Sequence, residues 1–445
     1  MSSSWNDPDF KTREDTALAS AGTFDVLRFA LVVASGPEAG ARFESTGERL
    51  GVGVHPANEV RVDDARVSRF HCELRVHPRG VQVRDLGSRN GTLVDGVRVD
   101  QAWVEHGATL RVGKTLLRFE LLGGKNRIPL SEQQSFGSLF GAAPSMRALF
   151  AVLELAAPTD STILLEGETG TGKEEAAQSI HDASLRREGP FVVLDCSALP
   201  PNLLEAELFG YERGAFTGAN KSKAGLFEEA HGGTLFLDEL GELRPDMQPA
   251  LLRVLEQREV RRLGSTRTFS VDVRLVAATH RDLREEVTAG RFREDLYYRL
   301  AVVHARIPPL RERLEDLPML ADVLLRRMGL GDVELATLLT PELLAAIGRS
   351  RWPGNVRELR NYLERCVVLG DVQPFAQATG PSHEPGRVDA RLPYADARTE
   401  ALARFERDYA AALLELHEGN VSAAARAAGL ARPYLHRILR RHGLR

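Results

Sequence analysis

A glycine-rich segment near the middle of the chain carries the residue types that bind phosphate. Its residues are Gly167, Glu168, Thr169, Gly170, Thr171, Gly172, Lys173 and Glu174. An apolar run at 163–165 precedes it and a helix-forming run at 174–178 follows, so the expected order is strand, turn and helix. In that order the backbone N–H groups and the positive end of the helix face one cavity. The segment predicts a phosphate-binding loop whose Lys173 reaches the outer phosphates, although Glu174 stands where such loops usually carry a Ser or Thr ligand for Mg²⁺.

Two adjacent carboxylates end a later apolar strand, expected at 234–237. Asp238 is predicted to bind Mg²⁺ and Glu239 to act as the base that polarises the attacking water. The alternative is that these are two exposed acids at a strand end without a catalytic role. The nearby phosphate-binding loop makes this alternative less favoured. His280 follows the next strand, at 271–277, and would face the terminal phosphate of the nucleotide. We expect these side chains to meet because the carboxyl ends of parallel strands share one sheet edge.

Two arginines, Arg293 and Arg299, lie in the segment 292–300, and both are candidate arginine fingers. Cations of this kind stabilise charge on a transferred phosphoryl group and can come from a neighbouring subunit. The alternative is a helix end whose arginines pair with Glu294 and Asp295.

Length and composition limit the class of protein. A chain of 445 residues corresponds to about three domains. With 43% hydrophobic and 27% charged residues it is typical of soluble proteins, and the net charge of −4 excludes a globally basic nucleic-acid binder. Three dispersed cysteines without metal-ligand spacing suggest reduced core residues. Because no apolar run of about eighteen residues occurs, we expect a cytoplasmic protein without a membrane contact.

Residues 24–122 contain short alternating strands separated by turn residues, which is typical of a β-sandwich. Two loops there carry hydroxyl, amide and guanidinium groups: Ser68, Arg69 and His71 in one, and Ser88, Arg89 and Asn90, followed by Gly91 and Thr92, in the other. This pattern resembles the forkhead-associated (FHA) domain, which implies binding of a phosphothreonine partner, such as a Ser/Thr kinase or its substrate. His71 is expected to orient the loop. Val52 stands where the family has a phosphate-contacting arginine, so a purely structural FHA fold is the alternative.

Residues 123–134 contain Gly, Lys and Ser and predict a short linker. Residues 136–370 alternate helices with buried strands and end in a helical lid, which predicts an α/β fold. A glycine-bounded tip occurs between the second and third strands: Gly214, Ala215, Phe216, Thr217, Gly218 and Ala219. With the preceding Glu-Leu-Phe-Gly run and the Trp-Pro-Gly-Asn-Val-Arg-Glu-Leu run at 352–359, this segment resembles the AAA+ activators of sigma-54 RNA polymerase.

The resemblance implies ATP and Mg²⁺ as cofactors, an oligomer (a hexamer when active), contact of the tip with sigma-54, and nucleotide sensing by Arg357. Glu174 fits this family. Asp195 and His280 stand where the family usually has asparagines, and an aspartate facing Glu239 would add like-charge repulsion.

Residues 394–445 predict an amphipathic helix, a second helix at 421–428 with Asn420 as its N-cap, a turn at Gly429 and a third, arginine-rich helix. The apolar stripe of the first helix is expected to be Leu402, Phe405, Tyr409, Leu413 and Leu416, and the inner face of the last helix Leu435, Ile438 and Leu439. This arrangement is a helix-turn-helix and resembles the Fis-type DNA-binding domain of the same activators. A basic solvated helix hairpin is the alternative. Arg432 and Tyr434 are predicted to contact bases and Arg440 and Arg441 to contact phosphates, with His436 and Arg437 also available.

The sequence thus predicts a three-domain protein: an FHA-like β-sandwich at 24–122, an AAA+ ATPase with helical lid at 136–370, and an all-α helix-turn-helix at 394–445. The expected function is ATP-dependent remodelling of the sigma-54 RNA polymerase closed complex from enhancer DNA. Two alternatives remain: an ATP-driven DNA remodeller unrelated to sigma-54, and a phosphopeptide-gated DNA-binding regulator with a weak or inert ATPase.

Overall fold

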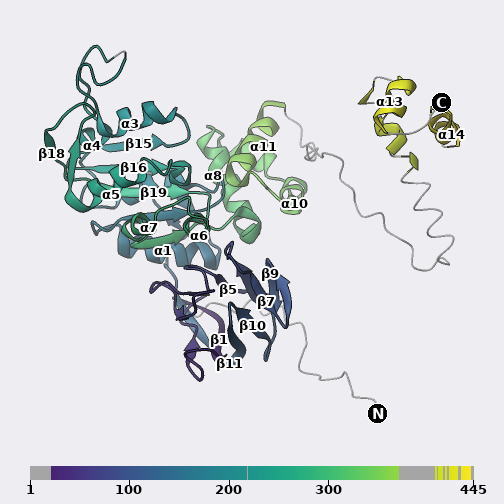
Figure 1. Ribbon diagram of the computed structural model, residues 1–445. Helices are drawn as coiled ribbons and strands as arrows, with labels where there is room; N and C mark the ends of the chain where they lie inside the picture. The colour runs from purple at the N-terminus through teal and green to yellow at the C-terminus, as the bar shows by residue number, and fades with distance from the viewer. Residues whose placement is uncertain are drawn as a thin grey trace. The chain divides into compact units, whose positions relative to one another are not determined.

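The computed structural model describes residues 22–217, 219–369 and 406–441, the last range without 408, 414–415, 418–419 and 429–431 (Figure 1). It divides into two compact units, Met1–Phe375 and Ala376–Arg445. No helix within the described ranges is both long and apolar enough to cross a membrane.

The N-terminal part of the first unit is a β-sandwich, as the strand pattern predicts. A six-stranded sheet has the order β2-β1-β11-β10-β7-β8, and a five-stranded sheet has the order β4-β3-β5-β6-β9. Alternate residues of both sheets form one core, which includes Phe29, Leu74 and Phe119. The strands are β1 Thr23–Ser35, β2 Arg42–Glu44, β3 Arg49–Gly53, β4 Val60–Arg61, β5 Cys72–His77, β6 Gly80–Asp85, β7 Thr92–Val94, β8 Val97–Val99, β9 Gln101–Val104, β10 Thr109–Val112 and β11 Thr115–Pro129.

The expected linker after residue 122 is instead the second half of β11. Residues 125–129 pair antiparallel with the start of β1, and the register shifts between Leu27 and Phe29. Gly124 lies at this irregularity with φ of 85°. Glycine tolerates that backbone conformation, so the Gly-Gly pair that suggests a linker marks a β-bulge within a long strand.

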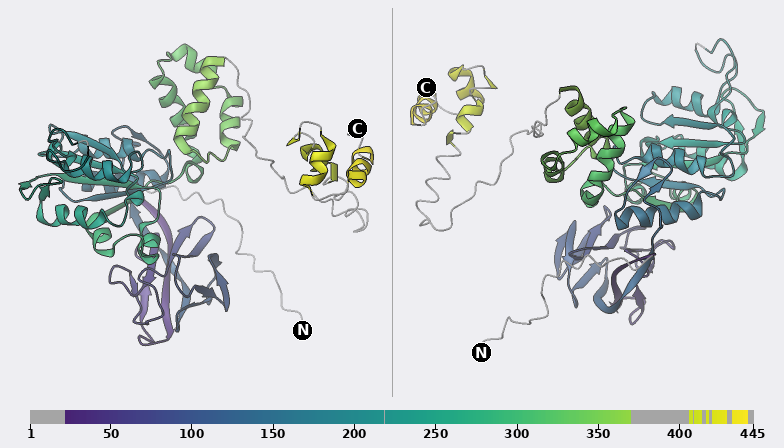
Figure 2. Two further views of the ribbon diagram at one scale, coloured as in Figure 1. Left: turned by 45° about the horizontal axis from the view of Figure 1, so that its top comes forward. Right: turned by 180° about the vertical axis from the view of Figure 1, so that it is seen from behind.

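The ATPase domain is built on a parallel five-stranded sheet of order β15-β16-β19-β14-β20. Its strands alternate apolar residues between two cores: Leu235 and Leu237 contribute to one face, and Phe236 to the other. Helices cover both faces (Figures 1 and 2). The sheet strands are β14 Ile163–Glu166, β15 Phe191–Asp195, β16 Thr234–Asp238, β19 Arg274–Thr279 and β20 Val303–Arg306.

Short elements complete this domain, and helices α8 to α11 form the lid around Trp352 and Leu363. The remaining elements are β12 Ser135–Phe136, β13 Leu139–Phe140, α1 Pro144–Ala156, α2 Lys173–Asp182, α3 Pro201–Phe209, α4 Leu226–Glu229, η1 Leu240–Glu242, α5 Gln248–Gln257, β17 Glu259–Arg261, β18 Thr268–Ser270, α6 Leu283–Thr288, α7 Glu294–Leu300, η2 Leu310–Glu312, η3 Leu314–Asp316, α8 Leu317–Arg327, α9 Asp332–Leu338, α10 Pro341–Arg349 and α11 Asn355–Leu369.

The second unit contains helices α13 Val421–Ala427 and α14 Arg432–Arg441, together with helical residues at 406–407 and 409–413. The Asn420 side chain accepts a hydrogen bond from the Ala423 amide at 3.2 Å, which confirms the predicted N-cap. Leu435 and Leu439 are buried against Ala424 in a small core, as the inner face of the second helix predicts. Leu416 is 76% exposed and therefore does not belong to the expected apolar stripe.

Candidate functional site: a nucleotide site and two flanking interaction loops

The glycine-rich loop joins β14 to α2, as predicted. Gly170 and Gly172 have φ of 79° and 106°, which residues with a Cβ rarely adopt. A Cβ on Gly170 would also lie 2.4 Å from the Gly354 carbonyl oxygen of the lid. Lys173 opens α2, is 6% exposed, and its Nζ donates to the carbonyl oxygen of Gly167 at 3.0 Å. The loop thus holds its lysine inward, ready to bind an anion.

Asp238 and Glu239 lie at the end of β16, next to the loop. The Glu239 carboxylate is 3.8 Å from Lys173 Nζ and accepts a hydrogen bond from His280 Nδ1 at 2.5 Å. Glu239 has φ of 49°, in the left-handed region, so its backbone is held in an uncommon conformation at the strand end. Burial, first of all, raises the pKa of Asp238, and the neighbouring Glu239 charge adds to this rise. The structure therefore brings Lys173, Asp238, Glu239 and His280 together.

Asp195 does not face Glu239, contrary to the expectation from the sequence. Asp195 ends β15 directly beside Asp238 in the sheet register. Its Oδ1 accepts hydrogen bonds from the Ser197 amide at 2.8 Å and hydroxyl at 2.6 Å. Its charge makes only a minor contribution to the rise in the pKa of Asp238. The local turn at Ser197 thus draws the carboxylate away, and the partner of Glu239 is His280.

The lid touches the loop through the start of α11. Asn355 Nδ2 donates to the Thr169 carbonyl oxygen at 3.1 Å, and the Val356 amide donates to the Gly170 carbonyl oxygen at 2.9 Å. Arg357, the predicted nucleotide sensor, follows with its own amide 3.3 Å from that oxygen. Arg311 also binds the Glu168 carboxylate, with bonds of 2.6 and 2.7 Å. Asn355 belongs to the run at 352–359 that carries the family resemblance, but the sequence assigned no role to Asn355 or Arg311, because neither belongs to a phosphate-binding pattern.

The two candidate finger arginines lie at opposite ends of α7 and have different partners within the chain. Arg293 precedes the helix and binds Asp295, with Nη2 to Oδ2 at 2.6 Å. Arg299 donates to the Leu255 carbonyl oxygen at 3.2 Å. The predicted pair between these arginines and the acidic helix start is therefore confirmed for Asp295 alone, since Glu294 points elsewhere.

The tip expected to contact sigma-54 lies between α3 and α4 and projects from the domain (Figure 1). The Gly214 amide donates to the Ala219 carbonyl oxygen at 2.9 Å and closes the loop. Phe216 is 40% exposed and its ring lies edge-on against Tyr211, with centroids 5.0 Å apart. Thr217 is exposed, and Gly218 lies outside the described residues. The loop thus presents an aromatic side chain and a hydroxyl at its surface.

The two FHA-like loops of the sandwich adjoin each other. Ser68 Oγ accepts a hydrogen bond from the Arg89 amide at 3.0 Å, and Asn90 Nδ2 donates to the Arg66 carbonyl oxygen at 2.6 Å. Ser88 Oγ donates to Asp85 at 2.6 Å and is buried, so this hydroxyl supports the loop. The His71 ring is fully buried and its Nδ1 accepts from the Ser68 amide, as expected for an orienting residue.

The side chain at position 52 is not at the surface where a phosphate could bind. Val52 is 0% exposed in the sandwich core, because its side chain points inward from β3. His55 instead lies beside Arg69: Asn58 Nδ2 donates to the carbonyl oxygens of both residues, at 2.9 and 2.8 Å. The turn residues Pro56 and Asn58 were the signal in the sequence that could have pointed to His55.

A buried ion cluster joins the sandwich to the ATPase domain. Glu73 of β5 binds Arg284 of α6 at 2.8 Å, and Arg284 binds Asp282 at 2.6 Å. All three side chains are at most 6% exposed, and Arg84 also pairs with Asp282. Burial favours a higher pKa for Glu73, but the positive charges of Arg284 and Arg75 outweigh it and lower the pKa to about 2.

Replacing Glu73 by glutamine is expected to lower the free energy of unfolding by about 3 kcal/mol, because the change leaves Arg284 buried with an incomplete set of partners. The stabilisation is present above pH 4.5, the usual Glu value, and disappears as the pH falls towards about 2. Urea unfolding at neutral pH measures this loss. Glu44→Gln, at an exposed pair with Arg28 and Arg42, is the control that should change little. An equal effect of the two substitutions would contradict the assignment.

The predicted DNA-contacting residues all belong to α14. His436 is half-buried, and Arg440 and Arg441 are exposed. Arg441 forms an ion pair with Glu406 at 3.2 Å. The side chains of Arg432, Tyr434 and Arg437 lie outside the described residues, so their predicted contacts stay predictions.

The residues present fit a magnesium nucleotide. Beyond the hydrogen bond from the Glu239 amide to Oδ1 at 2.9 Å, no bond from another described residue reaches the Asp238 carboxylate. No group of three or more His, Cys, Asp or Glu side chains that could hold a metal occurs in the part of the chain that is described. A Mg²⁺ ion at Asp238 would therefore complete its oxygen shell with water and nucleotide phosphates, as Mg²⁺ commonly does.

Comparisons with known proteins agree with this geometry. A family model described as "Sigma-54 interaction domain" matches residues 139–306, and one described as "AAA+ ATPase lid domain" matches 311–379. A model described as "Inner membrane component of T3SS, cytoplasmic domain" matches 32–122. The chain is 48% identical to transcriptional regulatory protein ZraR of Klebsiella oxytoca over 67% of each protein. It is 39% identical to transcriptional regulatory protein GlrR of Escherichia coli K12 over 87% of this chain and 86% of GlrR.

Among solved structures, NtrX from Brucella abortus is 36% identical, with a TM-score of 0.49, over 68% of this chain and 69% of NtrX. The match to GlrR covers 388 residues and therefore extends beyond the sigma-54 interaction domain at 139–306. The chain therefore belongs to the sigma-54-dependent transcriptional activators: it is an AAA+ ATPase that uses ATP and Mg²⁺ and has sigma-54 RNA polymerase as its partner.

Proposed function

We propose that this activator binds enhancer DNA through α13 and α14, assembles into a ring, and remodels the closed complex of sigma-54 RNA polymerase in the cytoplasm. The observation that carries the proposal is the cluster of Lys173, Glu239 and His280 within one domain whose projecting loop exposes Phe216 and Thr217. This combination joins a hydrolysis site to a surface suited to a protein partner.

The residues of the nucleotide site are proposed to have different roles in ATP binding and hydrolysis. Lys173 and the amides of residues 167–174 bind the phosphates, while Asp238 holds Mg²⁺, which neutralises charge on the phosphate oxygens when bound. Glu239 accepts the proton of the attacking water, and the hydrogen bond from His280 sets the direction of its carboxylate. Arg357 lies against the loop and would report the state of the nucleotide.

A ring is proposed because Arg293 and Arg299 contact Asp295 and the Leu255 carbonyl oxygen of their own chain rather than the nucleotide loop. An arginine that stabilises the transferred phosphoryl group would have to reach the site of a neighbouring subunit. We infer a hexamer from the family resemblance. The tip expected to contact sigma-54 would then move against it as the site cycles.

The sandwich is proposed to bind a phosphothreonine protein through Ser68, Arg69, Ser88, Arg89 and Asn90. Arg69 and Arg89 both have exposed side chains, and guanidinium groups form charge-assisted hydrogen bonds with phosphate.

Replacing Arg69 by alanine is expected to weaken phosphate-dependent binding about tenfold or more, since one charge-assisted bond of about 1.5–3 kcal/mol is lost. A fluorescence titration of full-length protein with peptides that carry a central phosphothreonine measures the effect. Arg79→Ala, in the turn that joins β5 to β6 at the ends of these strands opposite to the two loops, is the matched control. Binding that does not depend on the phosphate in the parent protein would leave the sandwich with a structural role alone.

A phosphopeptide-gated regulator with an inert ATPase is the second candidate, because Asp195 and His280 depart from the usual residues. Phosphate release measured on enhancer DNA separates it from the main proposal. Sustained release supports the main proposal, and its absence supports the second.

A further inference from the structure

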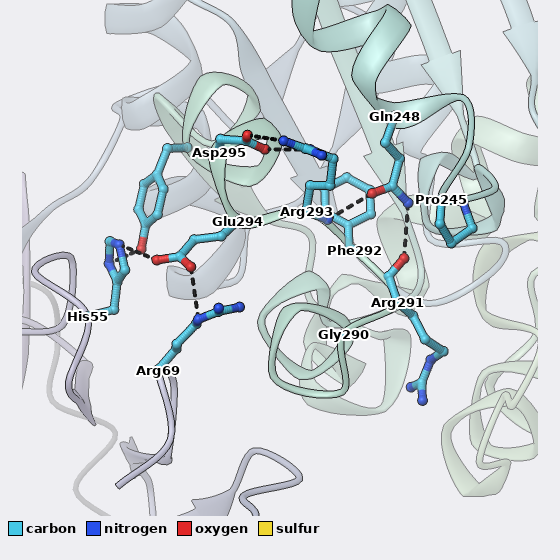
Figure 3. Close-up of a pocket in the computed structure, with 11 residues that line it drawn as sticks. His55, Arg69, Pro245, Gln248, Gly290, Arg291, Phe292, Arg293, Glu294 and Asp295 are labelled. Carbon is cyan, nitrogen blue, oxygen red and sulfur yellow. Dashed lines mark hydrogen bonds and ion pairs between the residues drawn. The ribbon is translucent and has the colours of Figure 1, made fainter. Parts of the chain in front are cut away.

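The loop of the sandwich that would bind phosphate also contacts the ATPase domain. Arg69 Nε lies 2.9 Å from Oε2 of Glu294, the first residue of α7 (Figure 3). Arg69 retains 53% of its side-chain exposure, and Glu294 retains 29%. The Glu294 carboxylate of the ATPase domain therefore occupies one edge of the Arg69 guanidinium, which is proposed to bind the phosphate.

His55 holds the second oxygen of the same carboxylate. Its Nε2 is 2.8 Å from Glu294 Oε1, and its ring stacks on Tyr298 of α7 with centroids 4.3 Å apart. Because Nδ1 accepts a hydrogen bond from the Ala57 amide at 3.1 Å, the ring proton belongs on Nε2, which donates to Glu294. Asn58 donates to the backbone carbonyl oxygens of both His55 and Arg69, so the backbones of the two residues that contact Glu294 are linked.

Phe70, next to Arg69, fixes this loop against the ATPase domain. It is 3% exposed and belongs to the core cluster of that domain. Its ring meets Tyr297 edge-on at 5.5 Å, and its carbonyl oxygen accepts a hydrogen bond from the Thr288 hydroxyl at 3.0 Å. The loop at 68–71, which is proposed to bind the phosphate, therefore also forms the contact with α7.

A pocket of about 520 Å³ adjoins the contact. Arg69, Arg291 and Arg293 line it, and Figure 3 shows Glu294 turned towards Arg69 while Arg293 is turned towards Asp295. Each of these arginines already pairs with one carboxylate: Arg69 with Glu294, Arg291 with Glu286 and Arg293 with Asp295. Because about half of the Arg69 side chain is still exposed to this open space, a phosphate can approach it from solvent.

We propose that Glu294 is an internal competitor for the phosphate of a phosphothreonine peptide on Arg69, and that peptide binding releases the start of α7 beside Arg293. The proposal rests on the phosphopeptide binding proposed above. The further point is that helix α7 of the same chain, through Glu294, occupies Arg69 when no peptide is bound.

Charge and exposure make the exchange favourable. A phosphothreonine carries a charge of about −1.5 to −2 at neutral pH, whereas the Glu294 carboxylate carries one negative charge. Ion pairs as exposed as Arg69–Glu294 are weak, so a phosphate can displace the carboxylate at modest cost. The buried cluster of Glu73, Arg284 and Asp282 does not include Arg69 and would keep the domains attached. Displacement would therefore act locally on α7.

The test compares Glu294→Gln with the parent in the full-length chain. The probe is a pool of fluorescein-labelled peptides with a central phosphothreonine, and fluorescence anisotropy measures the affinity. Glu294→Gln should bind about fivefold more tightly, because the competing charge is gone. Glu285→Gln, whose carboxylate pairs with Arg84 at 3.2 Å in the same interface, is the matched control and should bind as the parent does.

Hydrogen exchange gives a second readout. Adding the phosphorylated pool to the parent should accelerate exchange of the backbone amides in 294–300, and the unphosphorylated pool should not. Equal affinities of parent and Glu294→Gln, with phosphate-dependent binding in both, would overturn the competition and leave phosphopeptide sensing intact. A lack of phosphate-dependent binding in the parent, in Glu294→Gln and in Glu285→Gln would overturn sensing and competition together.

Discussion

Replacing Glu239 by alanine should lower steady-state ATP turnover by about a thousandfold, the middle of the range for loss of a general base. Glu239 is the carboxylate that the structure places between Lys173 and His280, with the shorter contact, 2.5 Å, to His280. Without it, the attacking water loses the group that accepts its proton, while Lys173 and Asp238 still bind the nucleotide. ATP affinity should therefore change little.

Phosphate release measures the turnover, and titration with a fluorescent ATP analogue measures the affinity. Glu259→Ala, at an exposed site on β17, is the control that should hydrolyse ATP as the parent does. Turnover by Glu239→Ala at the parental rate would end the assignment of the base. A parallel loss of ATP affinity would instead point to a collapsed site.

Local sequence patterns predicted the elements that carry the nucleotide site. Three apolar residues, a glycine-rich turn and a helix require few long-range contacts to be recognised, and residues 163–182 adopt that order. Asp238, Glu239 and His280 were expected at one sheet edge because parallel strands end together, and they do lie there.

Features that depend on contacts between distant residues were missed. The strand β20 pairs with β14 at the sheet edge, where His304 binds Glu166 at 2.7 Å; its polar residues hid it from an apolar pattern. The orientation of Asp195 depends on Ser197, a rotamer choice that residue type alone does not determine. The contact of Arg69 and His55 with Glu294 joins residues more than two hundred positions apart.

The exposed loop at Phe216 and Thr217 is the element that would convert ATP hydrolysis into work on sigma-54. Thr217 is exposed at the tip and remote in sequence from Lys173 and Glu239. Thr217→Ala should therefore hydrolyse ATP at the parental rate and yet lower promoter opening to the level seen without activator. The reason is that the substitution removes a surface hydroxyl at the proposed partner contact and leaves the nucleotide site untouched.

The most direct measurement is promoter opening by purified protein, sigma-54 holoenzyme and ATP, followed by permanganate reactivity of unpaired thymines. Thr337→Ala, at an exposed site on the lid, serves as control. We predict open promoters with the parent and with Thr337→Ala, and closed promoters with Thr217→Ala although its ATP turnover is intact. Promoter opening by Thr217→Ala as efficient as that of the parent would contradict the account.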